Sequence, residues 1–480
     1  MSSDPPVATE GLARVFTDVD QMTFAELSGD WNTMHMDPVL SRRTQAGGMV
    51  VHGMHAVLWS LETMARAHDL GALASIEVSF DRFIGVGENI DLDITVKSDR
   101  IIARIDGPAG RRMRVIARLG ESAAPNADGS GDWPVHDLAR RDARVLDLDE
   151  AGRTRGRIAI GGDLAGWGTL FPRLTAAIGP MAIDALAKTS TIVGMACPGR
   201  DSIYSSLKVR RLTQPGSFMS FRVTSVERSF RLLTLAIEGG GWSGEIEAFL
   251  RHPPIVQPTY AEIRRLIEPA ALSGQRVLVI GGSRGIGEVV AKIVAAGGAE
   301  VFITYLVGEA DARRVAAEIT GEGGSCETHR FDASKDPADQ LDRLPPPTHV
   351  YYFATSKIFG GGDVYSPERV RVFQEIYVDS FYRLCAYCNG LAAAIRVFYP
   401  SSVAVESRPR GMTEYAMAKA AGEVLAADMP RSMPGVSIDV VRLPRILTDQ
   451  TATLVPTDDP DSIQVMLPLV RAFHGLPAAD

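Results

Sequence analysis

The sequence predicts a multidomain protein in which an α+β region of two similar modules precedes an α/β region with a doubly wound parallel sheet. The length of 480 residues suits about three domains. A segment of small and polar residues, ESAAPNADGSGDWP at 121–134, separates two regions that both combine a helix with strands. A proline-rich segment, RHPPIVQPTYAE at 251–262, precedes a change to alternating strands and helices. We therefore expect modules at 1–120 and 150–255, joined by a linker at 121–149, and a third domain at 260–480.

The composition indicates an ordinary globular protein. Hydrophobic residues make up 45% and charged residues 22% of the chain. The net charge is -8, so no excess positive charge is available to bind phosphate backbones or anionic lipids. The first residues have neither secretory nor transit-peptide character, and no run approaches the roughly 20 apolar residues that a membrane helix needs. We expect a cytoplasmic protein with no nucleic-acid and no membrane partner.

The cysteines do not predict a disulfide framework or a metal site. Four cysteines in so long a chain are too few for such a framework. Cys385 and Cys388 form a CxxC pair, but they lie in YRLCAYCNGLAAAI, which has the pattern of a helix, and no second pair of ligands accompanies them. We therefore expect a buried helix face and no metal.

The first two modules share one order of elements. In the first, the apolar helix candidate GGMVVHGMHAVLWSLETMARA precedes the strands of SIEVSFDRFIGVGENIDLDITV. In the second, GPMAIDALAKTSTIVGMA precedes SIYSSLKVRRLTQPGSFMSFRVTSV, and aligning Gly87 with Gly216 places Val78 over Leu207. An internal repeat is the simplest explanation. Helices so apolar must be covered by sheet along most of their length, an arrangement called a hot dog, here in two copies that pair their sheets.

Residues 16–54 contain a series of separated features. In order along the chain they are a Phe-Ala pair, Ser-Gly-Asp, an Asn and a His, Asp-Pro, and a His-Gly at the start of the central helix. This series resembles the N-terminal signature of the MaoC-like, or (R)-specific enoyl-CoA hydratase, family. The resemblance covers most of the first module. It implies a hot-dog fold and an acyl thioester of CoA or of a carrier protein as the substrate.

The resemblance assigns Asp30 and His35 as the acid–base pair, because the matching residues of the family hold one water between them. One group draws a proton from that water while the conjugate acid supplies the α-proton. A neutral imidazole exchanges a proton near pH 7, and a partly buried carboxylate beside it can be tuned toward the same range. Gly53, at the start of the central helix, would present its backbone N–H to the thioester oxygen as the oxyanion donor.

Three local observations qualify this assignment. Without the surrounding signature, the aspartate would be a turn residue and the histidine an ordinary loop histidine. Thr33 stands where the family usually carries proline. His52 suits either packing at the helix start or a polar role near the oxyanion, and we favour packing.

The second module has no equivalent acid–base pair. Its segment IGGDLAGWGTLFPRLTAAIGP contains Asp163 but no histidine. We interpret this module as a structural half that widens the tunnel for the acyl chain. The tandem resembles the double-hot-dog hydratases of multifunctional fatty-acid oxidation enzymes, in which one half is likewise degenerate. Cys197 and Arg200 either line the acyl path or belong to a Gly-rich turn.

The third region begins with QRVLVIGGSRGIGEVV at 275–290, which leads from an apolar strand through a Gly-rich turn into a helix. Its glycines allow a tight turn and the close approach of a pyrophosphate to the helix N-terminus. Together with FDAS at 331–334 and a Ser, Tyr and Lys further on, this turn resembles the short-chain dehydrogenase/reductase family. The resemblance implies a Rossmann fold, and its cofactor-binding residues would be Gly281, Ser283, Arg284, Gly285, Ile286, Gly287, Asp332 and Lys419.

The same resemblance gives roles to the Ser-Tyr-Lys set. Tyr415 would deliver a proton to a carbonyl oxygen that Ser402 polarises, and Lys419 would lower the pKa of the phenol and hold the nicotinamide ribose. NADP(H) is favoured over NAD(H), because the strand ending in VFITYL has no Asp or Glu for a free 2′-hydroxyl and Arg284 can meet a 2′-phosphate. NAD(H) stays open if this arginine is only solvated.

The third region also departs from the family at three places. The usual Asn-Ala-Gly is replaced by Phe353, Ala354 and Thr355. The position of the family's helix asparagine is taken by Tyr377 or a neighbour. The usual Pro-Gly is replaced by Pro444-Arg445. These changes leave an inactive, binding-only fold open, whereas the complete Ser-Tyr-Lys set favours activity.

The two chemistries can meet in one substrate. A 3-oxoacyl reductase makes a 3-hydroxyacyl thioester, and an (R)-specific hydratase interconverts that thioester with the trans-2-enoyl form. We therefore expect a bifunctional enzyme of fatty acid metabolism, as a homodimer by analogy with both families. The alternatives are a reductase for an unrelated carbonyl or sugar substrate, or an acyl-binding or thioesterase module with an inactive dinucleotide-binding domain.

Overall fold

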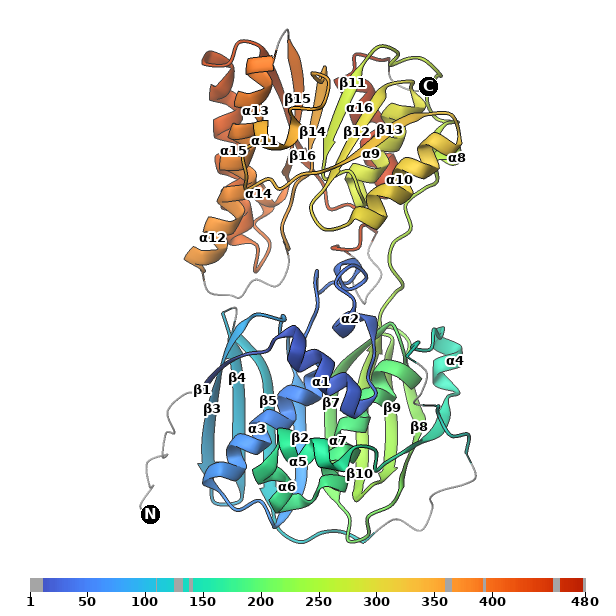
Figure 1. The fold of residues 1–480 in the computed structure, drawn as a ribbon, viewed down its shortest axis with the longest axis vertical. Helices are drawn as coiled ribbons and strands as arrows, with labels where there is room; N and C mark the ends of the chain where they lie inside the picture. Colours follow the sequence, from blue (N-terminus) through green and yellow to red (C-terminus); the bar gives the residue numbers. More distant parts are fainter. Residues whose placement is uncertain are drawn as a thin grey trace. The chain divides into compact units, whose positions relative to one another are not determined.

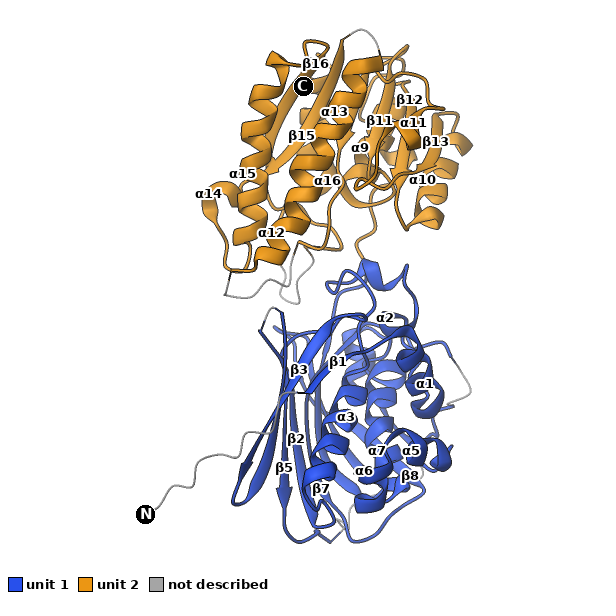
Figure 2. Ribbon diagram, turned by 60° about the vertical axis from the view of Figure 1, so that its left-hand side comes forward, with its two compact units in different colours: residues 1–253, 453–456 blue, residues 254–452, 457–480 orange. Residues whose placement is uncertain are grey.

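A computed structural model describes residues 12–108, 110–124, 133–137, 141–358, 365–391, 394–451 and 458–477. The chain forms two compact units, residues 1–253 with 453–456 and residues 254–452 with 457–480 (Figure 2). Of the predicted linker at 121–149, residues 125–132 and 138–140 lie outside the described residues.

The first unit contains a ten-stranded sheet in which all neighbouring strands are antiparallel. The strand order is β1-β3-β4-β5-β2-β7-β10-β9-β8-β6. Each module therefore arranges its five strands alike when read from its outer edge. The bounds are β1 Leu12–Val15, β2 Leu73–Phe80, β3 Asn89–Lys97, β4 Arg100–Gly107, β5 Gly110–Leu119, β6 Arg155–Ala159, β7 Ser202–Arg211, β8 Phe218–Glu227, β9 Leu232–Gly239 and β10 Trp242–Leu250.

The two modules join through strands β2 and β7. Val78 and Leu207, which the repeat alignment equates, face each other as partners in this central ladder. Residues at equivalent positions of two repeats pair directly only where an approximate twofold axis passes between their two strands. The sheet is therefore continuous across both modules.

Two long apolar helices lie on one face of this sheet, α3 (Gly53–Ala67) and α7 (Pro180–Thr191) (Figures 1 and 2). Every residue from Met54 to Met64 is buried, as predicted for a helix covered by sheet. Alternate residues of the strands face the helices, for example Ile90, Leu92 and Ile94 of β3. The remaining helical segments are α1 Asp18–Ser28, α2 Thr33–Met36, η1 Ser41–Arg43, α4 Leu148–Gly152, α5 Leu164–Leu170, α6 Pro172–Ile178 and η2 Ile192–Ala196.

The second unit is built on a parallel six-stranded sheet of order β13-β12-β11-β14-β15-β16. The chain order reverses between β11 and β14, and ligands of such sheets bind outside the carboxyl ends of the strands at this point. The strands are β11 Arg276–Ile280, β12 Glu300–Tyr305, β13 Ser325–Arg330, β14 His349–Tyr352, β15 Ile395–Ser402 and β16 Val436–Leu443.

Helices of the second unit carry the CxxC pair and the Tyr-Lys pair. Cys385 and Cys388 are buried on α13, as predicted for a helix face in the core. No helix among the described residues is long and apolar enough to cross a membrane. The helical segments are α8 Tyr260–Ile263, α9 Gly285–Ala296, α10 Glu309–Gly321, α11 Ala338–Leu341, α12 Pro367–Gln374, η3 Glu375–Asp379, α13 Ser380–Leu391, α14 Ala404–Ser407, α15 Thr413–Asp428, η4 Met429–Arg431 and α16 Ser462–Phe473.

Candidate active sites

The loop after α1 brings the predicted acid–base pair to the start of α3. Helix α1 ends at Ser28, and Gly29 follows in the left-handed conformation with φ 81°. Asn32 then caps the short helix α2 by accepting a hydrogen bond from the N–H of Met34 at 3.0 Å. The chain thus turns sharply between Asp30, in the loop, and His35, on α2.

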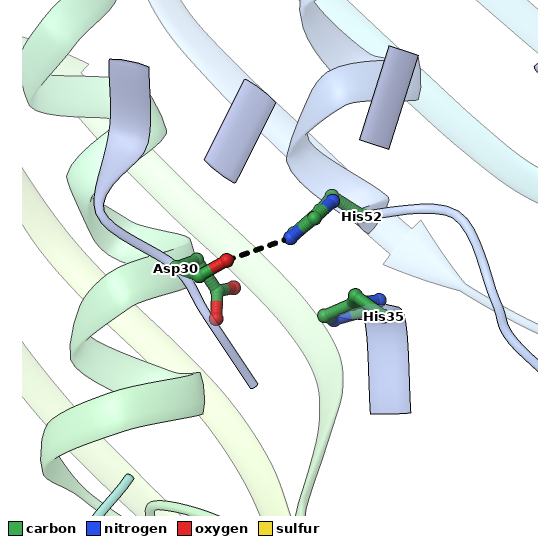
Figure 3. A group of neighbouring side chains, drawn as sticks. All are labelled: Asp30, His35 and His52. Carbon is green, nitrogen blue, oxygen red and sulfur yellow. Dashed lines mark hydrogen bonds between the residues drawn. The ribbon is translucent and has the colours of Figure 1, made fainter. Parts of the chain in front are cut away.

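Asp30, His35 and His52 form one group (Figure 3). One donor atom from each lies within 4.8 Å of the other two. The rings of His35 and His52 stack with their centroids 4.1 Å apart. From the sequence we favoured packing for His52, whereas the structure places it against both members of the predicted pair. A metal ion could also accept this spacing, and the expectation of no metal stays a prediction.

Hydrogen bonds fix which nitrogen of each ring carries a proton. Nδ1 of His35 lies 2.8 Å from the carbonyl oxygen of Val50, and Nε2 of His52 lies 2.9 Å from the carbonyl oxygen of Asp30. A carbonyl oxygen only accepts, so both nitrogens donate. A neutral His35 therefore keeps its Nε2 lone pair for a proton. Burial holds the pKa of His52 well below its usual range, so this ring stays neutral.

The carboxyl group of Asp30 is buried, and burial raises its pKa. Opposing this, the charge of His35 and hydrogen bonds from Ser190 and Asn32 favour the carboxylate. The hydroxyl of Ser190 donates to Oδ2 at 2.5 Å, and the N–H of Asn32 donates to Oδ1 at 3.2 Å. A carboxyl group that accepts a proton more readily than usual therefore lies beside a partly exposed imidazole, which is what acid–base catalysis requires.

The second module contributes polar groups to this loop. Lys188 Nζ donates to the carbonyl of Ser28 at 2.6 Å, and the hydroxyl of Thr191 donates to the same carbonyl at 2.7 Å. A Cβ added at Gly194 would lie 2.5 Å from Oδ1 of Asp30. These residues were not predicted, although polar side chains within an otherwise apolar helix are a signal of buried hydrogen bonding.

Gly53, the predicted oxyanion donor, is the first residue of α3. Its N–H has no carbonyl one turn earlier in the helix, so it is available to an acceptor at the positive end of the helix dipole. A Cβ added here would lie 2.7 Å from the ring of Phe80, so the position favours glycine. By contrast, Asp163 of the second module caps α5, accepting the N–H of Gly166 at 2.9 Å.

The two residues proposed for the acyl path differ in exposure. Cys197 is buried, and burial raises the pKa of its thiol to about 12, so this side chain stays protonated and packs in the core. The side chain of Arg200 is 40% exposed and lies 3.8 Å from Asp201.

A hollow of about 770 Å³ opens on the first unit, but none of the predicted site residues lines it. Its lining includes Glu77, Lys208 and Glu245, which are register neighbours on β2, β7 and β10. Their strand neighbours Val78 and Leu207 are buried among the core residues, so the hollow lies on the face turned away from the apolar helices. The hollow therefore does not support the candidate site, whose assignment depends on the chemistry of its side chains.

In the second unit, the Gly-rich turn lies between the carboxyl end of β11 and the start of α9. Gly281 and Gly285 have φ values of 80° and 58°, which favour glycine. A Cβ added at Gly287 would lie 2.2 Å from the carbonyl oxygen of Gly281. Ser283 is buried in the turn, Arg284 is the N-cap of α9 and Ile286 follows in its first turn.

Asp332, predicted to meet the adenine, follows β13. Its Oδ1 accepts hydrogen bonds from the N–H and the hydroxyl of Ser334, at 3.0 and 2.7 Å. These bonds lower the pKa of its carboxyl group. The carboxylate therefore organises its own loop in this structure.

The predicted Ser-Tyr-Lys set lies on β15 and α15. Ser402 ends the strand, and Tyr415 and Lys419 lie one turn apart on the helix. Burial raises the pKa of Tyr415, while a hydrogen bond from Ser402 opposes that shift. The expected lowering of this pKa by Lys419 stays a prediction. Burial also lowers the pKa of Lys419 to about 7.

Two residues at departures from the family pattern meet in the structure. Tyr377 lies in the π-helical turn η3, and its hydroxyl is 2.6 Å from Oγ1 of Thr355. The ring of Tyr377 also lies under the amine of Lys419. No sequence pattern predicts this contact.

Comparison with known proteins agrees with both resemblances. Residues 6–113 match the model of the MaoC like domain, and residues 275–344 match that of the short chain dehydrogenase. Curated protein sequences give no match.

Similar solved structures include short-chain dehydrogenases. One, from Serratia marcescens, is 20% identical, with 44% of this chain and 92% of that chain covered and a TM-score of 0.38. Another, from Burkholderia cenocepacia J2315 in complex with NADP, is 22% identical, with coverages of 42% and 91% and a TM-score of 0.38. From the two family matches, the chain carries a MaoC-like domain at its N-terminus and a short-chain dehydrogenase domain in its C-terminal region.

Proposed function

We propose that the chain is a bifunctional enzyme of acyl thioesters. The first unit interconverts a trans-2-enoyl thioester and the (R)-3-hydroxyacyl thioester, and the short-chain dehydrogenase domain interconverts the latter with the 3-oxoacyl thioester. The observation that carries this proposal is the approach of Asp30 and His35 at the start of a buried helix. Joining the two sites raises the local concentration of the shared intermediate.

In the direction of hydration, one group of the pair takes a proton from water while the water oxygen bonds to C3. The electrons of the C2–C3 double bond move toward the thioester carbonyl, and C2 then receives a proton from the conjugate acid. The free Nε2 of His35 and the raised pKa of Asp30 suit this exchange. The N–H of Gly53 stabilises the negative charge on the thioester oxygen.

We further propose that the two modules are tandem hot-dog copies, of which the second keeps the scaffold without the acid–base pair. The shared strand order and the pairing of Val78 with Leu207 support this proposal. Helices α3 and α7 occupy equivalent places before the strands of their modules.

In the proposed reductase site, Tyr415 delivers a proton to the carbonyl oxygen and Ser402 polarises it. The Gly-rich turn suits a dinucleotide, because a side chain at Gly281 would collide with the backbone oxygen of Phe353, directly after β14, and one at Gly287 with that of Gly281. When bound, the cofactor supplies the hydride. The absence of an acid at the end of β12 and the position of Arg284 at the helix start favour NADP(H).

The full-length protein tests both activities. With crotonyl-CoA we expect loss of the enoyl absorbance and formation of the 3-hydroxy product, and with acetoacetyl-CoA and NADPH we expect cofactor oxidation. Release of free CoA without hydration would indicate a thioesterase instead. If the protein reduces other carbonyl compounds but no 3-oxoacyl thioester of any chain length, the two units act on different substrates.

A further inference from the structure

Lys419 is buried, and among the described residues no carboxylate lies within ion-pairing distance of its amine, although the charge of Glu423 acts on it from farther away. Its residue is 4% exposed, and within the part of the chain that the structure describes no ion pair within 4.0 Å involves its amine. The nearest acid along α15 is Glu423, whose carboxylate pairs with Arg442 at 2.6 Å and accepts the hydroxyl of Ser401. A buried ammonium group needs other compensation, because burial disfavours its charged form.

Aromatic rings and one carbonyl surround this amine. Nζ donates to the carbonyl oxygen of Pro400 at 2.6 Å. It lies 4.0 Å from the ring centroid of Tyr377, on η3, and 5.0 and 5.9 Å from those of Tyr399 and Tyr415. The Tyr377 ring is thus the closest aromatic ring to the positive charge.

The ring of Tyr377 is held in this orientation. The hydroxyl of Thr355 donates to the carbonyl of Ser356 at 3.0 Å, so at their 2.6 Å contact the Tyr377 hydroxyl is the donor. The ring stacks on Phe373 at 5.9 Å and meets Tyr415 edge-on at 5.5 Å. The π-helical turn, a feature frequent at functional sites, positions it between these contacts.

We propose that Tyr377 is a positioning residue for Lys419, holding the ammonium group beside Tyr415 through its ring face in place of a carboxylate. The inference rests on the proposed reductase function for its catalytic consequence. A desolvated cation–π contact favours the charged amine. Without the ring, the pKa of Lys419 falls further below its usual range, and less of the amine is charged at neutral pH.

The test compares Tyr377→Phe, which keeps the ring, with Tyr377→Leu and Tyr377→Met, which remove it. In the full chain, NMR of selectively labelled lysine follows the titration of Lys419. We expect the midpoint to stay in the Phe variant and to fall by about one pH unit in the Leu and Met variants. For 3-oxoacyl reduction, the midpoint of the alkaline decline of kcat should move to lower pH by the same amount. KM should change little.

The matched control is Phe398→Leu, which removes a buried ring whose aromatic neighbours are Tyr351, Phe353 and Phe473, and which should leave the Lys419 midpoint unchanged. Thermal unfolding identifies variants that fold. An unchanged midpoint in the folded Leu or Met variant would overturn the proposal, as would a Phe variant that shifts as far as these two. If the wild-type protein reduces no thioester, the reductase assignment fails while the titration still tests the contact.

Discussion

The two modules of the first unit contribute different residues to the same site. The first module supplies the proposed acid–base residues, and the second supplies side chains that hydrogen-bond to them or to the preceding helix. The first supplies Asp30 and His35, the groups proposed to exchange protons. The second has no histidine before its helix, yet Ser190 donates to the acid and Lys188 to the end of α1. The module without an acid–base pair therefore remains constrained by the site it packs against.

The largest expected effect is on the first module. Asp30→Asn and His35→Ala each remove one half of the proton exchange, so we expect hydration of crotonyl-CoA to fall at least about a hundredfold. Reduction of acetoacetyl-CoA should continue unchanged, because the second unit holds its own residues. Loss of both activities in a folded variant would argue against independent sites.

Tyr415→Phe makes the reverse change. It removes the hydroxyl that delivers the proton, so we expect reduction to fall by about a hundredfold or more. Hydration should remain at the wild-type rate. Both rates are measured on one preparation, and a slower hydration would show that the units depend on each other.

Gly194→Ala tests whether the second module shapes the acid. The added methyl group would lie 2.5 Å from Oδ1 of Asp30, so the carboxyl group must move. We expect hydration to fall by about ten- to a hundredfold, since small misplacements of catalytic groups cost rate steeply. Gly162→Ala, in the same module with no atom within 4 Å of the added carbon, is the control.

Ser190→Ala should have the smallest effect. It removes a hydrogen bond that lowers the pKa of Asp30, so this pKa rises further above its usual range. If the carboxylate is the active form, the acid limb of the hydration profile moves to higher pH, and the rate at neutral pH falls by about tenfold, or roughly 1.5 kcal/mol. Ser190→Thr keeps a hydroxyl and should retain the profile. Equal profiles for both variants and the wild type would show that the bond is unimportant.

Much of the architecture could be predicted from the sequence. The segments that became α3 and α7 are apolar along most of their length, so we expected burial against a sheet for both. The strand, Gly-rich turn and helix at 275–290 likewise predicted the start of a parallel sheet.

The partners of the predicted residues could not be obtained in the same way. Ser190 and Asp30 are far apart in the sequence and meet only because α7 packs on α1. Tyr377 was identified as a departure from a pattern, but its contact with Lys419 depends on how η3 packs against α15. Local periodicity contains no information on such contacts.

The fused sheet has a consequence for how the site can change over generations. The offset that aligns Gly87 with Gly216 places Ser190 over Leu61, an apolar residue of α3. Two identical subunits would have to carry one residue type at both places, because a single gene segment would encode them. Under the proposed duplication within one gene, selection can place a hydroxyl at position 190 of α7 for the acid and keep an apolar side chain at position 61 of α3.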